Sequence, residues 1–214
     1  MSFVAFAMVK PTVTLYSQKM IYLLRHGETL WNRERRLQGQ RDSPLTARGV
    51  AQAQENGRRL KALIKDPKDW QILSSPLGRA WQTAVLVAES LELDPNAITF
   101  DPRLMEIAYG LWEGLTYAEM EARFPSLWRA RQADKWAVAV PGGESYAALA
   151  QRASAWLEGI CEKDRLIVVS HGGTGRVLRG HYAGLSPAET LDLIDEHSMI
   201  HALSQGRITS TRSD

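Results

Sequence analysis

Short apolar runs alternate along the chain with longer stretches in which apolar residues recur at helical spacing. Three apolar runs, bounded by polar, glycine or proline residues, are typical of buried parallel strands: Ile21–Leu24, Trp70–Leu73 and Leu166–Val169. Helical spacing and end signals predict helices over three stretches: Thr46 to about Ile64, Pro76 to Leu91, and Glu144 to Cys161. This alternation predicts an α/β fold, a three-layer αβα sandwich with a mostly parallel central sheet.

The chain after Met20 contains no repeat, low-complexity block or Gly/Ser linker. We therefore expect residues 20–214 to form a single domain. The first 19 residues read differently, because a short apolar stretch is followed by a lysine, a proline and several hydroxyl residues. They lack the long apolar core and the cleavage site of a secretory signal. We expect residues 1–19 to be a leader outside the fold.

Composition excludes several classes of protein. With 26 Lys and Arg against 24 Asp and Glu, the net charge is +2, too balanced for nucleic acid or an anionic membrane as the main partner. The chain has no run of about 18 apolar residues of the kind that spans a bilayer. Cys161 is the single cysteine, which excludes an internal disulfide and favours a reducing compartment, so we expect a cytoplasmic protein.

Ligands of such sheets bind beyond the carboxyl ends of the strands. The segments that directly follow the three predicted strands are Arg25-His26-Gly27, Ser74-Ser75-Pro76 and Ser170-His171-Gly172. Two of these turns carry a histidine followed by a glycine, which permits a sharp turn and a close approach to a ligand. Arg79 closely follows the turn without a histidine, Ser74-Ser75-Pro76. We therefore expect two histidines and two arginines at one edge of the sheet.

Such a group suits a phosphate. Arg25 and Arg79 offer planar, always-charged forks for phosphate oxygens. Four groups that can carry positive charge need a compensating anion when packed together. A helix that begins near Gly172–Gly173 would add N–H donors. Gly173-Thr174-Gly175 lacks the third glycine of a dinucleotide fingerprint, and the chain has no Gly-Lys pair for a Walker-type loop.

The other three histidines carry no such signal. His181, His197 and His201 are interpreted as ordinary surface or core residues. His197 and His201 have the i,i+4 spacing of a zinc-protease helix, but Ser198 stands where the glutamate of that motif would be. No metal site is predicted.

Several motifs occur in a fixed order between Met20 and about Leu185. They include Leu24-Arg25-His26-Gly27-Glu28-Thr29, Ser74-Ser75-Pro76-Leu77, Trp112-Glu113-Gly114, Pro141-Gly142-Gly143-Glu144-Ser145 and Ser170-His171-Gly172-Gly173. The chain resembles the histidine phosphatase superfamily, which includes cofactor-dependent phosphoglycerate mutases and many phosphatases. The resemblance implies a phosphoglycerate mutase-like fold.

The resemblance also implies a role for each site residue. His26 resembles the nucleophile that forms a phosphohistidine. Glu106 resembles the general acid and base. The other walls of the phosphate pocket would be His171, Arg25 and Arg79, with Asn32, Gln38 and the amides of Gly39 and Gly172 as further donors. Because no acidic cluster stands at these turns, we expect no metal and no cofactor.

The expected activity is hydrolysis of a small phosphorylated metabolite. Mutases of the family usually follow the glutamate with Arg-His-Tyr-Gly, whereas this chain has Ile107 and Ala108 before Tyr109-Gly110. That difference favours a phosphatase, with a phosphoglycerate mutase as the alternative. A catalytically silent phospholigand-binding module is the other alternative, although His26 and Glu106 are both retained.

Two further segments leave alternatives open. In 115–140, basic and aromatic residues are interleaved, which suits a lid that contacts substrate, or equally an amphipathic helix with aromatics in the core and charges in solvent. The weak alternation of Ser198–Ser210 predicts edge strands around a Gln205-Gly206 turn. Such an edge is compatible with a homodimer.

Overall fold

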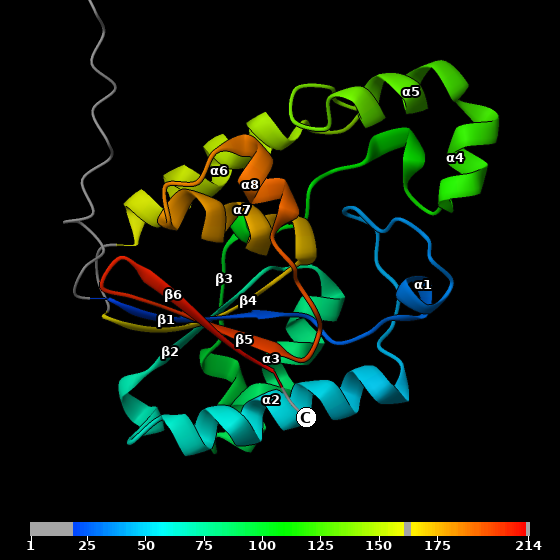
Figure 1. The fold of residues 1–214 in the computed structure, drawn as a ribbon. Helices are drawn as coiled ribbons and strands as arrows, with labels where there is room; N and C mark the ends of the chain where they lie inside the picture. Colours follow the sequence, from blue (N-terminus) through cyan, green and yellow to red (C-terminus); the bar gives the residue numbers. More distant parts are fainter. Residues whose placement is uncertain (1–18, 161–163, 213–214) are drawn as a thin grey trace, which may run out of the picture.

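A computed structural model describes residues 19–160 and 164–212. One six-stranded sheet runs through the middle of these residues, in the order β3-β2-β4-β1-β5-β6 (Figure 1). Its strands are β1 Met20–Arg25, β2 Gln71–Ser74, β3 Thr99–Phe100, β4 Arg165–Ser170, β5 Met199–Ser204 and β6 Arg207–Arg212. The pairs β1–β4, β2–β4 and β2–β3 are parallel, whereas β5 pairs antiparallel with β1 and with β6. The predicted α/β fold with a mostly parallel sheet is confirmed.

Helices cover both faces of the sheet. α2 Ala47–Leu63 and α3 Gly78–Ser90 lie on one face, and α6 Tyr146–Gly159, α7 Gly172–Tyr182 and α8 Pro187–Asp192 lie on the other (Figure 1). Alternate residues of β1 point to the two layers, since Ile21 and Leu23 pack with α6 and α7, while Tyr22 and Leu24 pack with α2 and α3. The apolar run of β1 is therefore explained by burial on both faces.

The remaining elements are short. They are α1 Leu30–Arg33, α4 Tyr117–Arg123, α5 Pro125–Ala133 and the 3₁₀ turns Pro67–Asp69, Pro95–Ala97, Pro102–Leu104 and Gly110–Trp112. α4 and α5 come from the segment 115–140 and lie beyond the end of the sheet at which β1 ends (Figure 1). That placement sets them near the expected site.

Two predicted helix starts are displaced by two residues. Thr46 caps α2 as predicted, because its Oγ1 accepts a hydrogen bond from the Gly49 amide. The second helix begins at Gly78 rather than Pro76, because the Oγ of Ser75 accepts from the Leu77 amide and holds that stretch in a turn. The third begins at Tyr146, because Ser145 is the cap that accepts from the Ala148 amide. Its predicted end, Cys161, lies outside the described residues.

The carboxyl-terminal hairpin differs from its prediction in one respect. Gln205 and Gly206 both have positive φ, 50° and 72°, as a two-residue hairpin turn requires. β6 is an edge strand as predicted, but β5 is not, since it pairs with both β1 and β6. Because β5 has a neighbouring strand on each side, its main-chain donors and acceptors are hydrogen-bonded on both sides. A homodimer through β6 stays a prediction.

Met20 begins β1, at the predicted start of the folded domain. The leader proper lies outside the described residues, except for Lys19, which is buried. Among the helices of the described ranges, none combines the length and the apolar character needed to cross a bilayer.

Candidate active site

A cavity of about 330 Å³ opens where β1, β2 and β4 end. All the predicted site residues except His171 line it: Arg25, His26, Asn32, Gln38, Gly39, Arg79, Glu106 and Gly172. Residues from segments far apart in the sequence therefore meet at the carboxyl edge of the sheet, as the fold class predicts.

His26 follows β1 directly and is 2% exposed. Its Nδ1 lies 2.8 Å from the carbonyl oxygen of Gly27, which can only accept, so Nδ1 carries the proton. Nε2 in turn accepts a hydrogen bond of 3.3 Å from Nε of Arg79. Burial, followed by the charge of Arg79, holds the pKa of His26 well below the ordinary histidine value of 6.5. The ring is therefore neutral at neutral pH, with a lone pair on Nε2.

Arg79 stands in the first turn of α3 and is 1% exposed. It donates to the carbonyl oxygens of Gly39 and Arg41, each at 2.7 Å, and forms an ion pair of 2.9 Å with Asp42. The guanidinium is thus fixed before any ligand arrives. Asp42, which our interpretation of the sequence overlooked, supplies one compensating negative charge.

His171 is buried beside His26 and does not line the cavity itself. It caps α7, and its ring centre lies 5.2 Å from that of His26. Nε2 lies 2.8 Å from Oγ of Ser75, while Nδ1 is buried without a partner among the described residues. Burial, and next the charge of Arg79, lowers the pKa of His171 well below 6.5. Of the four groups that can carry positive charge, the two histidines are therefore neutral and the two arginines carry the charge.

The loop between α8 and β5 supports both Arg25 and His26. Arg25 donates through Nη1 to the carbonyl oxygen of Asp195 at 2.8 Å. Nδ1 of His197 donates to the carbonyl oxygen of His26 at 2.6 Å, and the two ring centres are 5.4 Å apart. Burial, and next the charge of Arg25, lowers the pKa of His197 to about 4. His197, interpreted from the sequence as an ordinary surface or core residue, thus lies beside His26 with its Nδ1 hydrogen-bonded.

His201 helps to anchor this loop. Its Nε2 lies 3.3 Å from the carboxylate of Asp195, which also lies 3.6 Å from Arg179. His197 and His201 thus serve different partners instead of facing one metal. Within residues 19–160 and 164–212, no group of three or more His, Cys, Asp or Glu side chains could hold a metal ion.

Glu106 lies opposite, at the N-terminus of α7. Its carboxylate accepts from the main-chain amides of Gly173 at 3.0 Å and Thr174 at 3.1 Å, an arrangement that suits a negative charge at a helix N-terminus. A Cβ on Gly173 would stand 2.6 Å from Oε1 of Glu106, so this contact requires glycine. The carboxylate is therefore aimed by main-chain donors.

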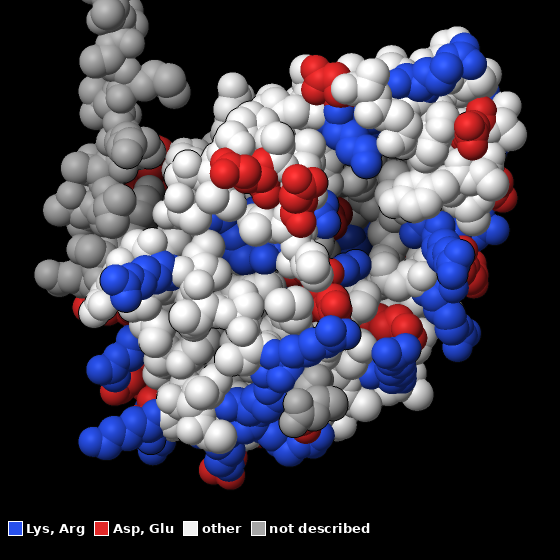
Figure 2. All heavy atoms as spheres, in the orientation of Figure 1, with Lys and Arg blue, Asp and Glu red and all other residues white. Residues whose placement is uncertain are grey.

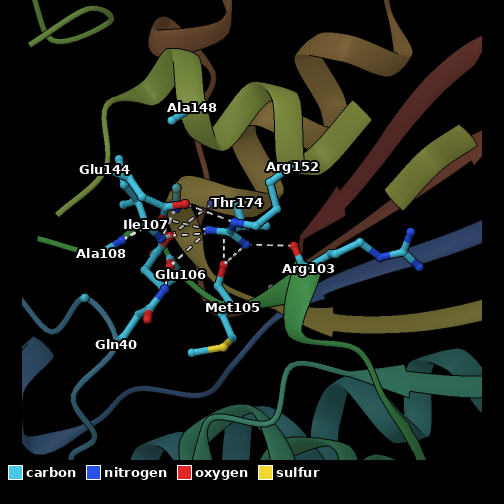
Figure 3. Close-up of polar contacts among 12 residues, drawn as sticks. Gln40, Arg103, Met105, Glu106, Ile107, Ala108, Glu144, Ala148, Arg152 and Thr174 are labelled. Atoms are coloured by element: carbon cyan, nitrogen blue, oxygen red, sulfur yellow. Dashed lines mark hydrogen bonds and ion pairs between the residues drawn. The ribbon is translucent and has the colours of Figure 1, made fainter. Parts of the chain in front are cut away.

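Arg152 of α6 holds the main chain that carries Glu106 (Figure 3). It donates to the carbonyl oxygens of Arg103 and Met105, each at 2.8 Å, and to that of Glu106 at 3.3 Å. Its charge is balanced by Glu144 at 2.9 Å. The hydrogen bonds from Arg152 therefore fix the main chain at Glu106, although Glu106 lies in no helix or strand.

The remaining predicted site residues lie in α1 and in the loop that follows it. Oδ1 of Asn32 accepts from the Thr29 amide in a capping box, which leaves Nδ2 as the end that can donate to a ligand. Oε1 of Gln38 is buried without a partner among the described residues. Gly39 has a φ of +55°, which favours glycine. The glycine after His26 has a different role from the predicted one, since a Cβ on Gly27 would collide with the main chain of Gly49 rather than with a ligand.

Sequence reasoning missed several residues that line the cavity. They include Arg176, Tyr109 and Tyr146, whereas Tyr117 belongs to the segment 115–140, for which a lid that contacts substrate was one of the two interpretations. Arg176 had a detectable signal, because it stands four residues after Gly172 and so shares its helix face. Tyr109 and Tyr146 had none, since their approach to the site depends on how distant segments pack.

Comparison with known proteins places these features in a family. The family model described as the histidine phosphatase superfamily (branch 1) matches residues 21–207. A Proteus mirabilis protein named "Probable phosphoglycerate mutase GpmB" is 41% identical over 156 residues, which cover 71% of this chain and 69% of that protein.

Solved structures extend the comparison. The alpha-ribazole phosphatase from Shigella flexneri has a TM-score of 0.77 at 26% identity, covering 90% of this chain and 95% of that one. A mycobacterial glucosyl-3-phosphoglycerate phosphatase complexed with VO3 has a TM-score of 0.70 at 29% identity, covering 92% and 98% of the two chains. The relatives thus bear names of both phosphatases and mutases.

Proposed function

Because the chain belongs to the histidine phosphatase superfamily (branch 1), we propose that it hydrolyses a small phosphomonoester through a phosphohistidine on His26, without a metal ion. One observation carries the proposal. The ring of His26 is neutral, its proton is held on Nδ1 by Gly27, and its unprotonated Nε2 lies at a cavity lined by Arg25 and Arg79, where it accepts a 3.3 Å hydrogen bond from Nε of Arg79 that must break when phosphate binds. This is the state in which a histidine can attack phosphorus.

The first step transfers the phosphoryl group to the enzyme. The lone pair on Nε2 of His26 forms the N–P bond while the bond from phosphorus to the leaving oxygen breaks. The leaving oxygen takes a proton from the carboxyl group of Glu106. Arg25 and Arg79 stabilise the charge on the other phosphoryl oxygens. The hydrogen bond from Nδ1 to Gly27 stabilises the ring as it becomes positive.

The second step releases phosphate. The carboxylate of Glu106 takes a proton from water, the water oxygen bonds to phosphorus, and the N–P bond breaks with its electrons returning to Nε2. His26 is neutral again and Glu106 is protonated. One phosphomonoester and one water thus give an alcohol and phosphate, with both residues restored.

The surroundings of Glu106 support a phosphatase over a mutase. Ile107 is fully buried in the core, and the Ala108 amide is bonded to the carboxylate of Glu144. Neither position supplies the charge that mutases of the family place after the glutamate. This chain matches at least 95% of the length of the two phosphatases among the structural relatives, which also supports this choice.

A phosphate-release assay with a chelator present tests the function. We expect release from a panel of phosphomonoesters, and we expect it to persist as the pH falls to about 6, because the pKa of His26 lies well below 6.5. Complete loss on chelation, restored by a divalent ion, would contradict the metal-free mechanism. Absence of release together with conversion between phosphoglycerates would favour the mutase.

His197 is expected to act as a positioning residue for the nucleophile. His197→Leu removes the donor to the His26 carbonyl oxygen, and we expect kcat to fall about tenfold, the value of one lost hydrogen bond to a buried acceptor. His197→Asn can place an amide N–H where Nδ1 lies, so it should restore most of the rate. Rapid-quench measurement of phosphohistidine formation separates the two variants. Equal rates for Leu and Asn would show that the hydrogen bond has no such role.

A further inference from the structure

A second cavity, of about 900 Å³, adjoins the catalytic one. The two share the wall residues Leu37, Tyr109, Tyr117, Tyr146 and Arg176. The rest of the second cavity is lined by Trp112, Met120 of α4, α5, the loop after α5, and α8. Figure 2 shows a hollow between the region of α4 and α5 and that of α7 and α8, with basic side chains bordering it. A molecule whose phosphate lies at His26 therefore has room to extend in this direction.

Six of the 18 residues that line this second cavity are aromatic. Trp128 of α5 lies 5.9 Å from both Trp112 and Tyr117, measured between ring centres. Trp136 stacks on Tyr146 at 6.4 Å, with 18° between the planes. Of the two interpretations left open for 115–140, the one that placed all its aromatics in the core is incomplete, because Tyr117, Trp128 and Trp136 line the cavity. Such walls favour a planar group that can stack.

Positive charge is built into the same walls. Arg131 is only 4% exposed, and its guanidinium lies 5.4 Å from the ring centre of Tyr109 and 5.9 Å from that of Tyr146. Its Nη2 is buried without a hydrogen-bond partner in the described part of the chain. A buried guanidinium usually has a carboxylate partner, and Arg131 has none within the described residues.

Arg176 adds a second charge at the junction of the two cavities. It donates to the Leu193 carbonyl oxygen at 2.9 Å and to the hydroxyl of Tyr146 at 3.4 Å, and forms no ion pair with a described carboxylate. Arg131 and Arg176 thus both lie next to Tyr146, and neither forms an ion pair with a described carboxylate, although Asp134 and Asp192 also line this cavity. Charge of this kind favours an anionic ligand.

We propose that the leaving group of the substrate occupies this second cavity, and that it is a planar ring system bearing an acidic group. The proposal rests on the proposed phosphatase function and narrows its substrate class. The phosphate binds at His26, the ring stacks between the aromatic walls, and the acidic group balances Arg131 and Arg176.

Matched substrates test the two parts of this proposal separately. Glycerol phosphate, phenyl phosphate, naphthyl phosphate and a carboxynaphthyl phosphate differ in ring area and then in charge. We expect kcat/KM to rise about tenfold from phenyl to naphthyl phosphate, because a second ring is buried, and about tenfold again with the carboxylate. The different intrinsic reactivities of the leaving groups are corrected by dividing by the rates of the uncatalysed reactions.

Variants assign each preference to its residues. Trp136→Ala should lower the preference for naphthyl over glycerol phosphate about tenfold. Arg131→Met keeps the buried volume but removes the charge, and should lower the preference for carboxynaphthyl over naphthyl phosphate about tenfold. Trp81→Ala is the matched control, since Trp81 is a half-exposed tryptophan of α3 that lines neither cavity. It should leave both preferences unchanged.

Inhibition of the unmodified protein supplies a measurement that does not depend on variants folding. Naphthoate should inhibit phenyl phosphate hydrolysis at about tenfold lower concentration than naphthol. If phenyl phosphate is hydrolysed but neither ring size nor charge changes kcat/KM, the inference is overturned and the phosphatase function stands. If no substrate is hydrolysed and no phosphohistidine forms, the function fails and the inference fails with it.

Discussion

Replacing His26 by alanine is expected to lower phosphate release by 10⁴- to 10⁶-fold, roughly the loss seen when a catalytic nucleophile is removed. The side chain supplies the Nε2 lone pair, and the neighbouring His171 is buried with its Nε2 hydrogen-bonded to Ser75. Steady-state phosphate release measures the loss. Mass spectrometry after a rapid quench should show phosphohistidine in the unmodified protein and none in the variant.

The control for this experiment is His181→Ala. His181 stands near the end of α7, where its ring contacts Ser154 outside the catalytic cavity. We expect its rate to stay within about twofold of the unmodified protein, since surface substitutions rarely matter. Release that survives His26→Ala would show that the nucleophile is wrong or that the activity comes from a contaminant.

Replacing Glu106 by glutamine is expected to lower kcat by about 10²- to 10⁴-fold, the usual contribution of a general acid and base. The amide cannot protonate a leaving oxygen. The loss should therefore be largest for a poor leaving group such as an alkoxide and smallest for p-nitrophenyl phosphate, whose leaving group needs no proton. Steady-state rates on both substrates measure the difference.

Glu55→Gln is the matched control, because Glu55 is an exposed carboxylate of α2 that pairs with Arg58. It should leave both rates unchanged. Glutamine at position 106 also places an NH₂ group near the amides of Gly173 and Thr174, so the melting temperature must be compared as well. If the two substrates lose rate equally while the fold is intact, Glu106 positions the ligand and is not the acid.

The positions of the site residues were predictable because they depend on chain direction. A residue that directly follows a parallel strand must lie at the carboxyl edge of the sheet, so His26, Arg25 and Gly172 were placed by their spacing alone. Glu106 does not directly follow a parallel strand, and its role was implied by the family resemblance. Its placement is explained by Arg152 and the amides of α7, which are contacts that spacing does not encode.

The ionisation of the site was predictable only in part. An unprotonated His26 was expected from the nucleophilic role that the resemblance implies, but burial, the largest cause of the lowered pKa values of His26 and His171, could not be read from the sequence. His197 was overlooked for the same kind of reason. His197 contacts His26 because the loop between α8 and β5 packs against the nucleophile, although about 170 residues separate the two in the sequence. At that separation, the sequence pattern gives no information on distance.

The sequence by itself determined the α/β architecture and the set of groups that gather at one edge of the sheet, because periodicity of apolar residues specifies the elements, and strand direction specifies where their ends meet. Only the tertiary structure decided which histidines are neutral, that Asp42 balances Arg79, and that a second aromatic cavity adjoins the first. These properties depend on burial and on contacts between distant segments, and both arise when the chain packs.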